Sequence, residues 1–194
     1  YLFRRTYKLQ KGQTILFHAA AGGVGLIAMQ WAKALGVTVI GTVGSEEKAA
    51  LARKFGCDHT ILYNKENVAE RVREITNGEM VPVVYDSVGK DTFQASIDSL
   101  RPFGLMASFG NASGPVPPMP LTALKGSLYI TRPSLMAHTA DRDVLDEMSA
   151  DLFKMVSSGK VHIPIDQRYP LAEARQAHID LEGRKTTGST ILLP

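Results

Sequence analysis

The first two thirds of the chain alternate between short continuous apolar runs and stretches with helical spacing. The apolar runs are rich in β-branched residues and end at glycine or polar residues, which is typical of buried strands. Strands are predicted over residues 14–18, 37–43, 59–62, 81–85, 105–109 and 127–131. Because the runs are continuous rather than alternating, we expect a parallel sheet with helices on both faces. The pattern therefore predicts an α/β fold with a doubly wound parallel sheet.

Helical spacing is clearest directly after the first strand, where apolar residues fall on one predicted face and Gly36 ends the helix. That face consists of Val24, Ile27, Ala28, Trp31 and Leu35. Further helices are predicted over residues 46–55, 68–76, 92–100, 142–157 and 171–182, and short strands over 163–165 and 189–193. Residues 1–5 are expected to be the last turns of a helix. Since the chain begins without methionine, we also expect it to be part of a longer protein.

A glycine-rich turn, Ala-Ala-Ala-Gly-Gly-Val-Gly at residues 19–25, joins the first strand to this helix. Such a turn lets a phosphate approach the backbone, and the helix start offers unpaired N–H groups and a positive dipole end. The match to G-x-G-x-x-G is imperfect, because Ala20 takes the first position and Gly22 and Gly25 the other two. The turn is consistent either with a dinucleotide site in a Rossmann sheet or with close packing of a helix on the sheet.

The end of the second strand bears on which dinucleotide would bind. Sheets that bind NAD usually place a carboxylate there to accept hydrogen bonds from the adenosine ribose. Residues 41–45 read Gly-Thr-Val-Gly-Ser, without an acid, and Ser45 and Lys48 could instead contact a 2′-phosphate. Lys48 sits in the first turn of a predicted helix, where a cation opposes the dipole. It is either a solvated residue or a sign of a bound anion, and we favour NADPH over NADH.

Residues 110–120 interrupt the strand and helix alternation. Four prolines in these eleven residues exclude a helix or a central strand. The segment is either a surface connection or a loop lining a ligand cleft. The second interpretation follows from its position after a parallel strand, where open α/β sheets bind ligands.

Composition excludes several other classes. The 22 basic and 19 acidic residues give a formal charge of +3, and the basic residues are scattered, so we do not expect a nucleic-acid partner. A single cysteine, Cys57, excludes an internal disulfide and fits a cytoplasmic protein. No signal peptide and no apolar run of about 18 residues is present, so we expect no membrane association. The five histidines have no metal-ligand spacing, and His18 is expected to be packed or bonded to backbone.

Several segments together resemble one enzyme family. They are FHAAAGGVGLIAMQWAKALG, GTVGSEEK, VVYDSVGKDTF, LMASFGNASGPV, KGSLYITRPSL, RYPLAEARQAH and GRKTTGSTILLP. The resemblance is to zinc-independent NADPH:quinone oxidoreductases, the zeta-crystallin-like branch of the medium-chain dehydrogenase/reductase superfamily. It covers essentially the whole chain, and alanine at position 20 is normal in this branch.

The resemblance implies a cofactor site that extends along the chain. It assigns the pyrophosphate to Gly22, Gly23, Val24 and Gly25. It assigns the adenosine 2′-phosphate end to Gly44, Ser45, Lys48 and Tyr63. It also implies that Arg184 reaches back to the cofactor as a further cation. It assigns the nicotinamide end to Ser87, Phe109, Gly110, Asn111, Pro133, Ser134 and Leu135. Taken without the resemblance, Tyr63 could be a half-buried aromatic residue at a strand end, and Arg184 a solvated charge.

The resemblance also implies an organisation and an activity. It predicts a cofactor-binding domain over residues 1–160 and a segment over 161–194 that returns to a mostly absent GroES-like catalytic domain. The expected reaction is hydride transfer from NADPH to a quinone without a metal, with no identifiable general acid. Residues 127–131 would form the edge strand of a homodimer. The alternatives are an enoyl or alkenal reductase of the same superfamily and a non-catalytic module for nucleotide binding or dimerisation.

Overall fold

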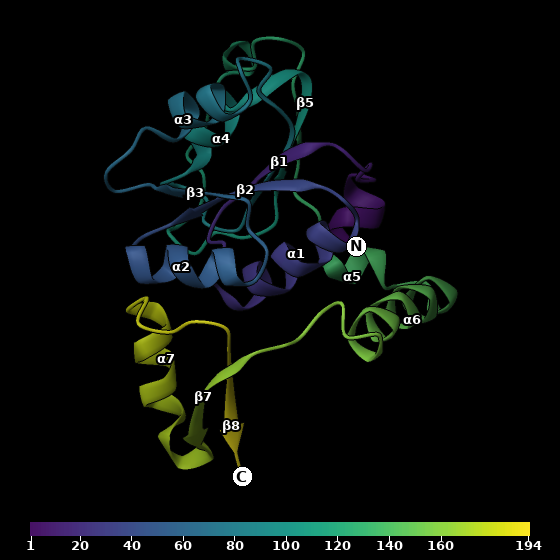
Figure 1. Cartoon of the computed structure of the whole chain (residues 1–194), viewed down its shortest axis with the longest axis vertical. Coiled ribbons are helices and arrows are strands. Elements are labelled where there is room, and N and C mark those ends of the chain that lie inside the picture. The colour runs from purple at the N-terminus through teal and green to yellow at the C-terminus, as the bar shows by residue number, and fades with distance from the viewer.

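The computed structural model describes residues 1–194 and contains a six-stranded parallel sheet in the order β3-β2-β1-β4-β5-β6 (Figure 1). Its strands are β1 (Thr14–Phe17), β2 (Thr38–Val43), β3 (His59–Leu62), β4 (Val81–Asp86), β5 (Leu100–Ser108) and β6 (Tyr129–Thr131). After β3 the chain crosses back to place β4 beside β1, so the strand order switches between these two strands. This is the doubly wound α/β fold that the apolar pattern predicts.

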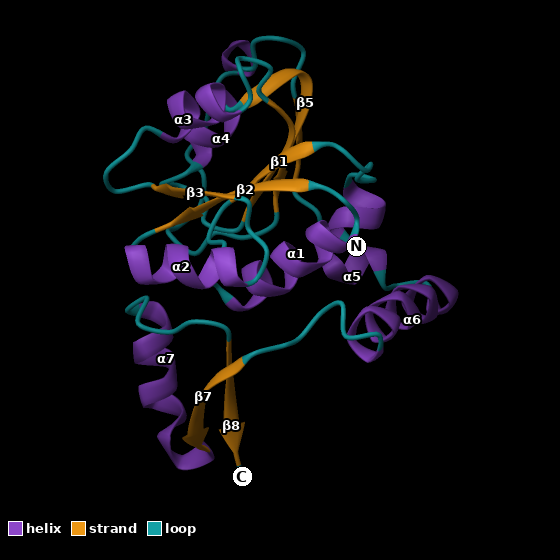
Figure 2. Ribbon diagram, viewed as in Figure 1, coloured by secondary structure: helices purple, strands orange, loops and turns teal.

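Helices cover both faces of this sheet (Figure 2). One face carries α1 (Gly23–Ala34) and α2 (Glu46–Lys54), and the other carries α3 (Val68–Ile75) and α4 (Phe93–Asp98). The chain starts with a π-helical turn, Leu2–Thr6, and two further helices, α5 (Leu135–His138) and α6 (Arg142–Ser157), follow β6. A short 3₁₀ turn, Leu121–Ala123, precedes β6.

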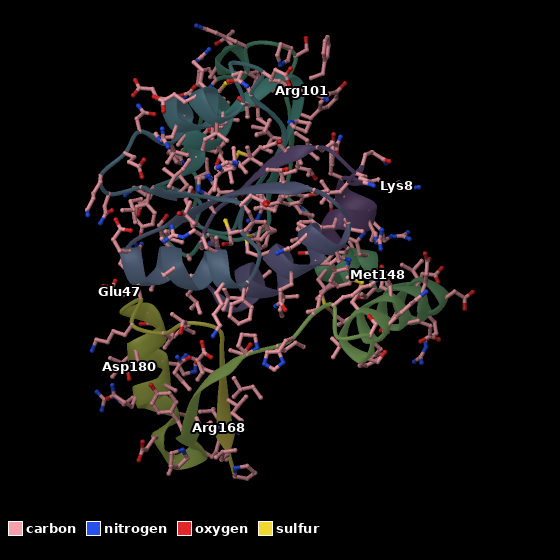
Figure 3. The ribbon with its side chains drawn as sticks, in the orientation of Figure 1. Lys8, Glu47, Arg101, Met148, Arg168 and Asp180 are labelled. Carbon is pink, nitrogen blue, oxygen red and sulfur yellow. The ribbon has the colours of Figure 1, made fainter.

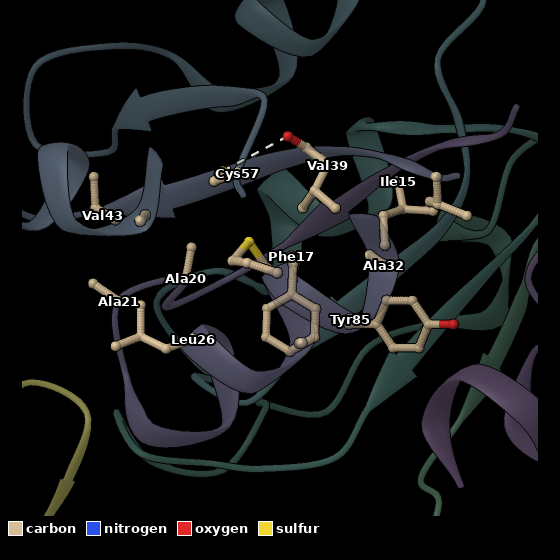
Figure 4. Packing of buried hydrophobic residues seen from close by; sticks show 14 of the residues in the cluster. Ile15, Phe17, Ala20, Ala21, Leu26, Ala32, Val39, Val43, Cys57 and Tyr85 are labelled. Atoms are coloured by element: carbon tan, nitrogen blue, oxygen red, sulfur yellow. Dashed lines mark hydrogen bonds between the residues drawn. The ribbon is translucent and has the colours of Figure 1, made fainter. Parts of the chain in front are cut away.

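Two apolar clusters fill the space between the sheet and its helices. Ile15 and Phe17 of β1 face the α1 and α2 side, whereas Leu16 between them faces the α3 and α4 side. Figure 4 shows the first cluster, in which the rings of Phe17 and Tyr85 stack with centroids 5.7 Å apart. Because β1 is buried on both faces, its continuous apolar run needs no polar alternation.

The C-terminal segment forms a separate small sheet. Strands β7 (Ile165–Pro170) and β8 (Ser189–Leu193) pair in parallel, connected by the 3₁₀ turn Leu171–Glu173 and helix α7 (Ala174–Glu182). Arg168 and Asp180 mark β7 and α7 in Figure 3. The division of the chain at residues 160 and 161, and the assignment of this segment to a catalytic domain, stay predictions.

Helix α1 is rotated relative to the predicted face. The fully buried side chains are Leu26, Met29 and Ala32, whereas Val24 is 56% exposed. The cause lies at Gly25, because a Cβ there would be 2.4 Å from the carbonyl oxygen of Ala19. This close approach sets which side of the helix meets the sheet, and apolar spacing does not contain that information.

Other element boundaries also differ from the prediction. The strand predicted at 163–165 is wrong in position, because β7 lies at Ile165–Pro170 and consists largely of exposed polar residues without an apolar signal. Strand β5 begins at Leu100, where a helix end is predicted, and its pairing with β4 is irregular between Val81 and Val83. Helix α5 has only four residues and is not predicted. The helix predicted at 171–182 begins as the 3₁₀ turn.

Candidate functional site

A cleft of about 690 Å³ runs along the carboxyl ends of β1, β2 and β4. This is the edge at which open α/β sheets bind ligands, and the cleft spans the point where the strand order switches. Its lining includes ten of the predicted cofactor residues: Gly22, Gly23, Val24, Gly25, Gly44, Lys48, Tyr63, Ser87, Phe109 and Arg184. Thus the structure brings most of the predicted set to one surface.

The glycine turn forms the centre of the cleft. Gly22 caps the start of α1 without a side-chain hydrogen bond, so the first N–H groups of the helix have no capping side chain. A Cβ on Gly22 would lie 3.3 Å from the carbonyl oxygen of Ala19. A Cβ on Gly23 would lie 2.9 Å from the carbonyl oxygen of Gly188 in the C-terminal segment. Gly25 packs on the turn itself, so the interpretation as close helix packing applies to this glycine. The interpretation as a dinucleotide site applies to Gly22.

The end of the cleft beside β2, here called the β2 end, contains Gly44, Lys48, Tyr63 and Arg184. A Cβ on Gly44 would be 2.6 Å from the Tyr63 hydroxyl, so glycine leaves room for that side chain. The Lys48 Nζ donates to the carbonyl oxygen of Arg184 at 2.7 Å. Lys48 therefore lies against the backbone of Arg184, from a distant part of the chain, while the Arg184 guanidinium is 3.7 Å from the Asp91 carboxylate. No carboxylate follows β2 directly.

Ser45 is beside this end but does not line the cleft. Its hydroxyl caps α2 by accepting from the Lys48 N–H at 3.3 Å. A hydrogen bond from Ser45 also lowers the pKa of Glu47, which lies in the first turn of α2 (Figure 3). The structure thus gives Ser45 an N-cap role, and its contact with a cofactor stays a prediction.

The opposite end, here called the β4 end, contains Ser87 and Phe109. Gly110 lies behind it, since a Cβ there would be 2.5 Å from the Ser87 carbonyl oxygen. Ala112 of the proline-rich loop lines the cleft, which supports the second interpretation of that loop. Asn111, Pro133, Ser134 and Leu135 do not belong to the lining. Their role, like that of Gly110, stays a prediction.

A buried polar network lies beneath the cleft, and apart from His18 its members were not predicted. His18 is fully buried, with Nδ1 2.9 Å from the Thr42 hydroxyl and Nε2 3.0 Å from the Ser96 hydroxyl. The Ser96 hydroxyl donates in turn to Asp86 at 2.8 Å. His18 is therefore packed, as expected, but its partners are side chains rather than backbone. Burial lowers its pKa, although the Asp86 charge opposes this shift.

Sequence reasoning also missed lining residues from the C-terminal segment, namely Leu181 and Thr186. Asp91 also lines the cleft, and its carboxylate is 3.7 Å from the Arg184 guanidinium. The buried polar network had one signal in the sequence. His18 and Asp86 are polar residues that directly follow the apolar runs of β1 and β4.

A second hollow of about 740 Å³ lies between α1, α2 and the segment leading to β7. Its cations include Lys33 and Lys54, which occupy the last turns of α1 and α2, where they complement the helix dipoles. Their positions need no bound anion.

The structure brings together no group of three His, Cys, Asp or Glu side chains that could hold a metal ion. It also contains no helix with the length and apolar character needed to cross a membrane.

The sequence of residues 23–150 matches the family described as zinc-binding dehydrogenase. The chain belongs to this family. Within it, the whole chain is 58% identical to a quinone oxidoreductase from Pseudomonas aeruginosa and covers 60% of that relative's length. It is also 50% identical to a 2-haloacrylate reductase from a Burkholderia species, again over the whole chain and 59% of the relative.

A solved structure is also similar to this chain. The whole chain superposes on the quinone oxidoreductase of Escherichia coli complexed with NADPH with a TM-score of 0.98 and 52% identity, and covers 61% of that protein. These relatives confirm the resemblance to quinone oxidoreductases. The chain spans about three fifths of the length of the curated relatives it matches.

Proposed function

We propose that the protein reduces quinones with NADPH and that this chain supplies its cofactor-binding part. The observation that carries the proposal is the β2 end of the cleft, where Lys48 lines the cleft against the Arg184 backbone and no carboxylate follows β2 directly. A 2′-phosphate would be repelled by an acid there and would be attracted by the Lys48 ammonium. The quinone oxidoreductases at 58% and 52% identity, one of them complexed with NADPH, support the same cofactor and substrate class.

We assign each end of the cleft to one part of the cofactor. The adenosine half lies at the β2 end, the pyrophosphate at Gly22, Val24 and the α1 start, and the nicotinamide half at the β4 end beside Ser87. The cleft fits such a group, because side chains are absent where the turn approaches it and the basic residues Lys48 and Arg184 line it.

Bound NADPH would supply a hydride from its nicotinamide C4. The residues of this chain bind and orient the cofactor and exclude water, while Phe109 gives the β4 end an apolar surface. A quinone is electrophilic enough to accept a hydride without a metal to polarise it. No side chain in the β4 end is assigned as a general acid.

Lys48→Ala tests the cofactor. Removing this cation should weaken NADPH binding by about 1.5–3 kcal/mol, the scale of a hydrogen bond to a charged group, and leave NADH binding nearly unchanged. Fluorescence titration of the full-length protein with both cofactors measures the difference. Lys54→Ala, at the other end of α2, is the matched control and should change neither affinity. Equal losses for NADPH and NADH in Lys48→Ala would refute the assignment.

A second candidate function is reduction of an activated carbon–carbon double bond. The specific support is the 2-haloacrylate reductase at 50% identity, because the whole chain matches it as it matches the quinone oxidoreductases. Steady-state assays of the full-length protein with NADPH against a quinone series, 2-haloacrylates and alkenals separate the two. We expect the largest kcat/KM for quinones, and a larger value for 2-haloacrylate would replace the first proposal with the second.

The proposal includes no metal. Its support is that no three His, Cys, Asp or Glu side chains of this chain come together as metal ligands, and that no histidine or cysteine lines the cleft. Dialysis of the full-length protein against a chelator should therefore leave quinone reduction unchanged, with the zinc content followed by elemental analysis. Loss of activity that added Zn²⁺ restores would show that a metal takes part.

The proposal also includes a cytoplasmic homodimer. Strand β6 is the outermost strand of the six-stranded sheet, and Tyr129 and Ile130 on it are exposed. An uncovered strand edge favours pairing with a second copy across a two-fold axis. We further propose that residues 161–194 complete a GroES-like catalytic domain.

A further inference from the structure

The carboxyl ends of four neighbouring strands carry a row of polar residues on the α3 and α4 side. The last buried apolar row on this side consists of Ile40, Leu16, Val84 and Met106, which are in register across β2, β1, β4 and β5. Two residues further along each strand come Thr42, His18, Asp86 and Ser108, and all four are buried. Polar residues in this position lie directly beneath the cleft.

Asp86 is the most heavily bonded member of the row. Its fully buried carboxylate accepts from the N–H groups of Val88 and Gly89 at 2.8 and 3.0 Å. It also accepts from the hydroxyls of Thr92 at 2.8 Å and Ser96 at 2.8 Å. No lysine or arginine pairs with it in the structure. A buried carboxylate without a cation is costly unless such donors surround it. The hydrogen bonds of Asp86 therefore hold these donor groups in place around it.

These bonds act on the wall of the cleft. Ser87 and Val88 line the β4 end, and they lie between Asp86 and Gly89, whose N–H group the carboxylate holds. Thr92, which begins α4, also lines the cleft and donates to both carboxylate oxygens. The same carboxylate thus fixes the turn after β4 and the start of the next helix.

We propose that Asp86 is a positioning residue, which holds the wall formed by Ser87, Val88 and Thr92 in the shape that receives the nicotinamide half of the cofactor. This inference rests on the proposed function, since it takes NADPH as the ligand. Asp86 acts through the backbone and hydroxyl groups it binds and does not itself line the cleft.

The Ser96 hydroxyl extends this arrangement toward the β2 end. Because a carboxylate only accepts hydrogen bonds, the Ser96 hydroxyl donates a hydrogen bond to Asp86 and accepts one from His18 Nε2–H. His18 Nδ1 then accepts from the Thr42 hydroxyl. Ser96→Ala breaks this link while the bonds of Asp86 to Val88, Gly89 and Thr92 remain, so it separates the two parts of the network.

Asp86→Asn and Thr92→Val test the proposal in the full-length protein by comparing two ligands. NADPH contacts both ends of the cleft, whereas adenosine 2′,5′-bisphosphate represents only the adenosine half. We expect both variants to bind NADPH about five- to tenfold more weakly and the bisphosphate within about twofold of wild type. Ser99→Ala, which removes another buried hydroxyl close to α4, is the control and should change neither affinity.

The outcomes distinguish the two proposals. Equal loss of both ligands would show a general loss of structure, and unchanged NADPH binding in both variants would show no positioning role; either overturns the inference. Thr92→Val keeps the Asp86 carboxylate and decides the matter where Asp86→Asn fails to fold. If the wild type binds NADH and not the bisphosphate, the NADPH assignment fails, and the same comparison with NADH and AMP still tests Asp86.

Discussion

At the scale of single residues, His18 shows how burial and hydrogen bonding act together. Both ring nitrogens have hydroxyl partners, and no water reaches the ring. Desolvation lowers the pKa of His18 more than the charge of Asp86 raises it, so the folded protein holds the neutral ring.

This shift makes stability depend on pH. The unfolded chain binds a proton at His18 more readily than the folded one, so the stabilisation is fully present above the unfolded pKa of about 6.5 and is lost as the pH falls below it. We expect the free energy of unfolding to fall by up to about 1.4 kcal/mol per pH unit from this group. Urea unfolding at pH 7.5 and 5.5 measures the loss, which should be smaller in His18→Gln.

The control for this prediction is His59→Gln, which replaces an exposed histidine at the start of β3. Its loss of stability on acidification should match that of the wild type. A loss in His18→Gln as large as in the wild type would contradict the role assigned to burial of this ring.

At the scale of elements, the start of α1 is set by contact between its first turn and the preceding loop. A Cβ on Gly25 would lie 2.4 and 2.5 Å from the carbonyl oxygens of Ala19 and Ala20. Both are backbone atoms that cannot turn aside as a side chain would. The third glycine of the motif is therefore required by packing, even before any ligand is considered.

Gly25→Ala should destabilise the protein by about 1–3 kcal/mol, because overpacking outweighs the gain of up to about 1 kcal/mol in helix propensity. Gly22→Ala is the matched variant in the same turn. Its Cβ would lie 3.3 Å from Ala19 and its φ is −78°, so we expect less than about 1 kcal/mol. Thermal unfolding of the two variants measures the difference, and equal stability would contradict the packing argument.

At the scale of the whole molecule, the six-stranded sheet has two different edge strands. On one side β3 is outermost, and on the other β6 contributes only three residues, of which Tyr129 is 59% and Ile130 40% exposed. An exposed edge strand with apolar side chains favours association with another copy of the chain. This edge is therefore where the proposed homodimer would form.

Ile130→Arg should convert the dimer to a monomer, because the substitution places a charge in the middle of the pairing edge. Sedimentation velocity on the full-length protein at micromolar concentration measures the change. Leu121→Arg, which alters an 83% exposed residue outside the strands, should leave the dimer intact. A wild-type monomer, or a dimer that persists in Ile130→Arg, would contradict this edge as the interface.

Much of the architecture could be predicted because it depends on local signals. The continuous apolar runs of β1, β2 and β4 predicted a parallel sheet, and the glycine turn predicted the place of the cleft. Strand β7 could not be predicted in this way, because its exposed polar residues depend on pairing with β8, more than twenty positions away. The early start of β5 could not be predicted either, because it depends on the pairing of Leu100 with Val81.

The sequence by itself determined the alternating elements, the doubly wound class and the cations available to a cofactor, since these follow from periodicity and residue type. Only the tertiary structure decided which residues share a surface. It placed Arg184 beside Lys48, rotated α1 about Gly25, and joined His18 to Asp86 through Ser96. The reason is physical: these contacts join residues distant in sequence, and chain folding, not local spacing, brings them together.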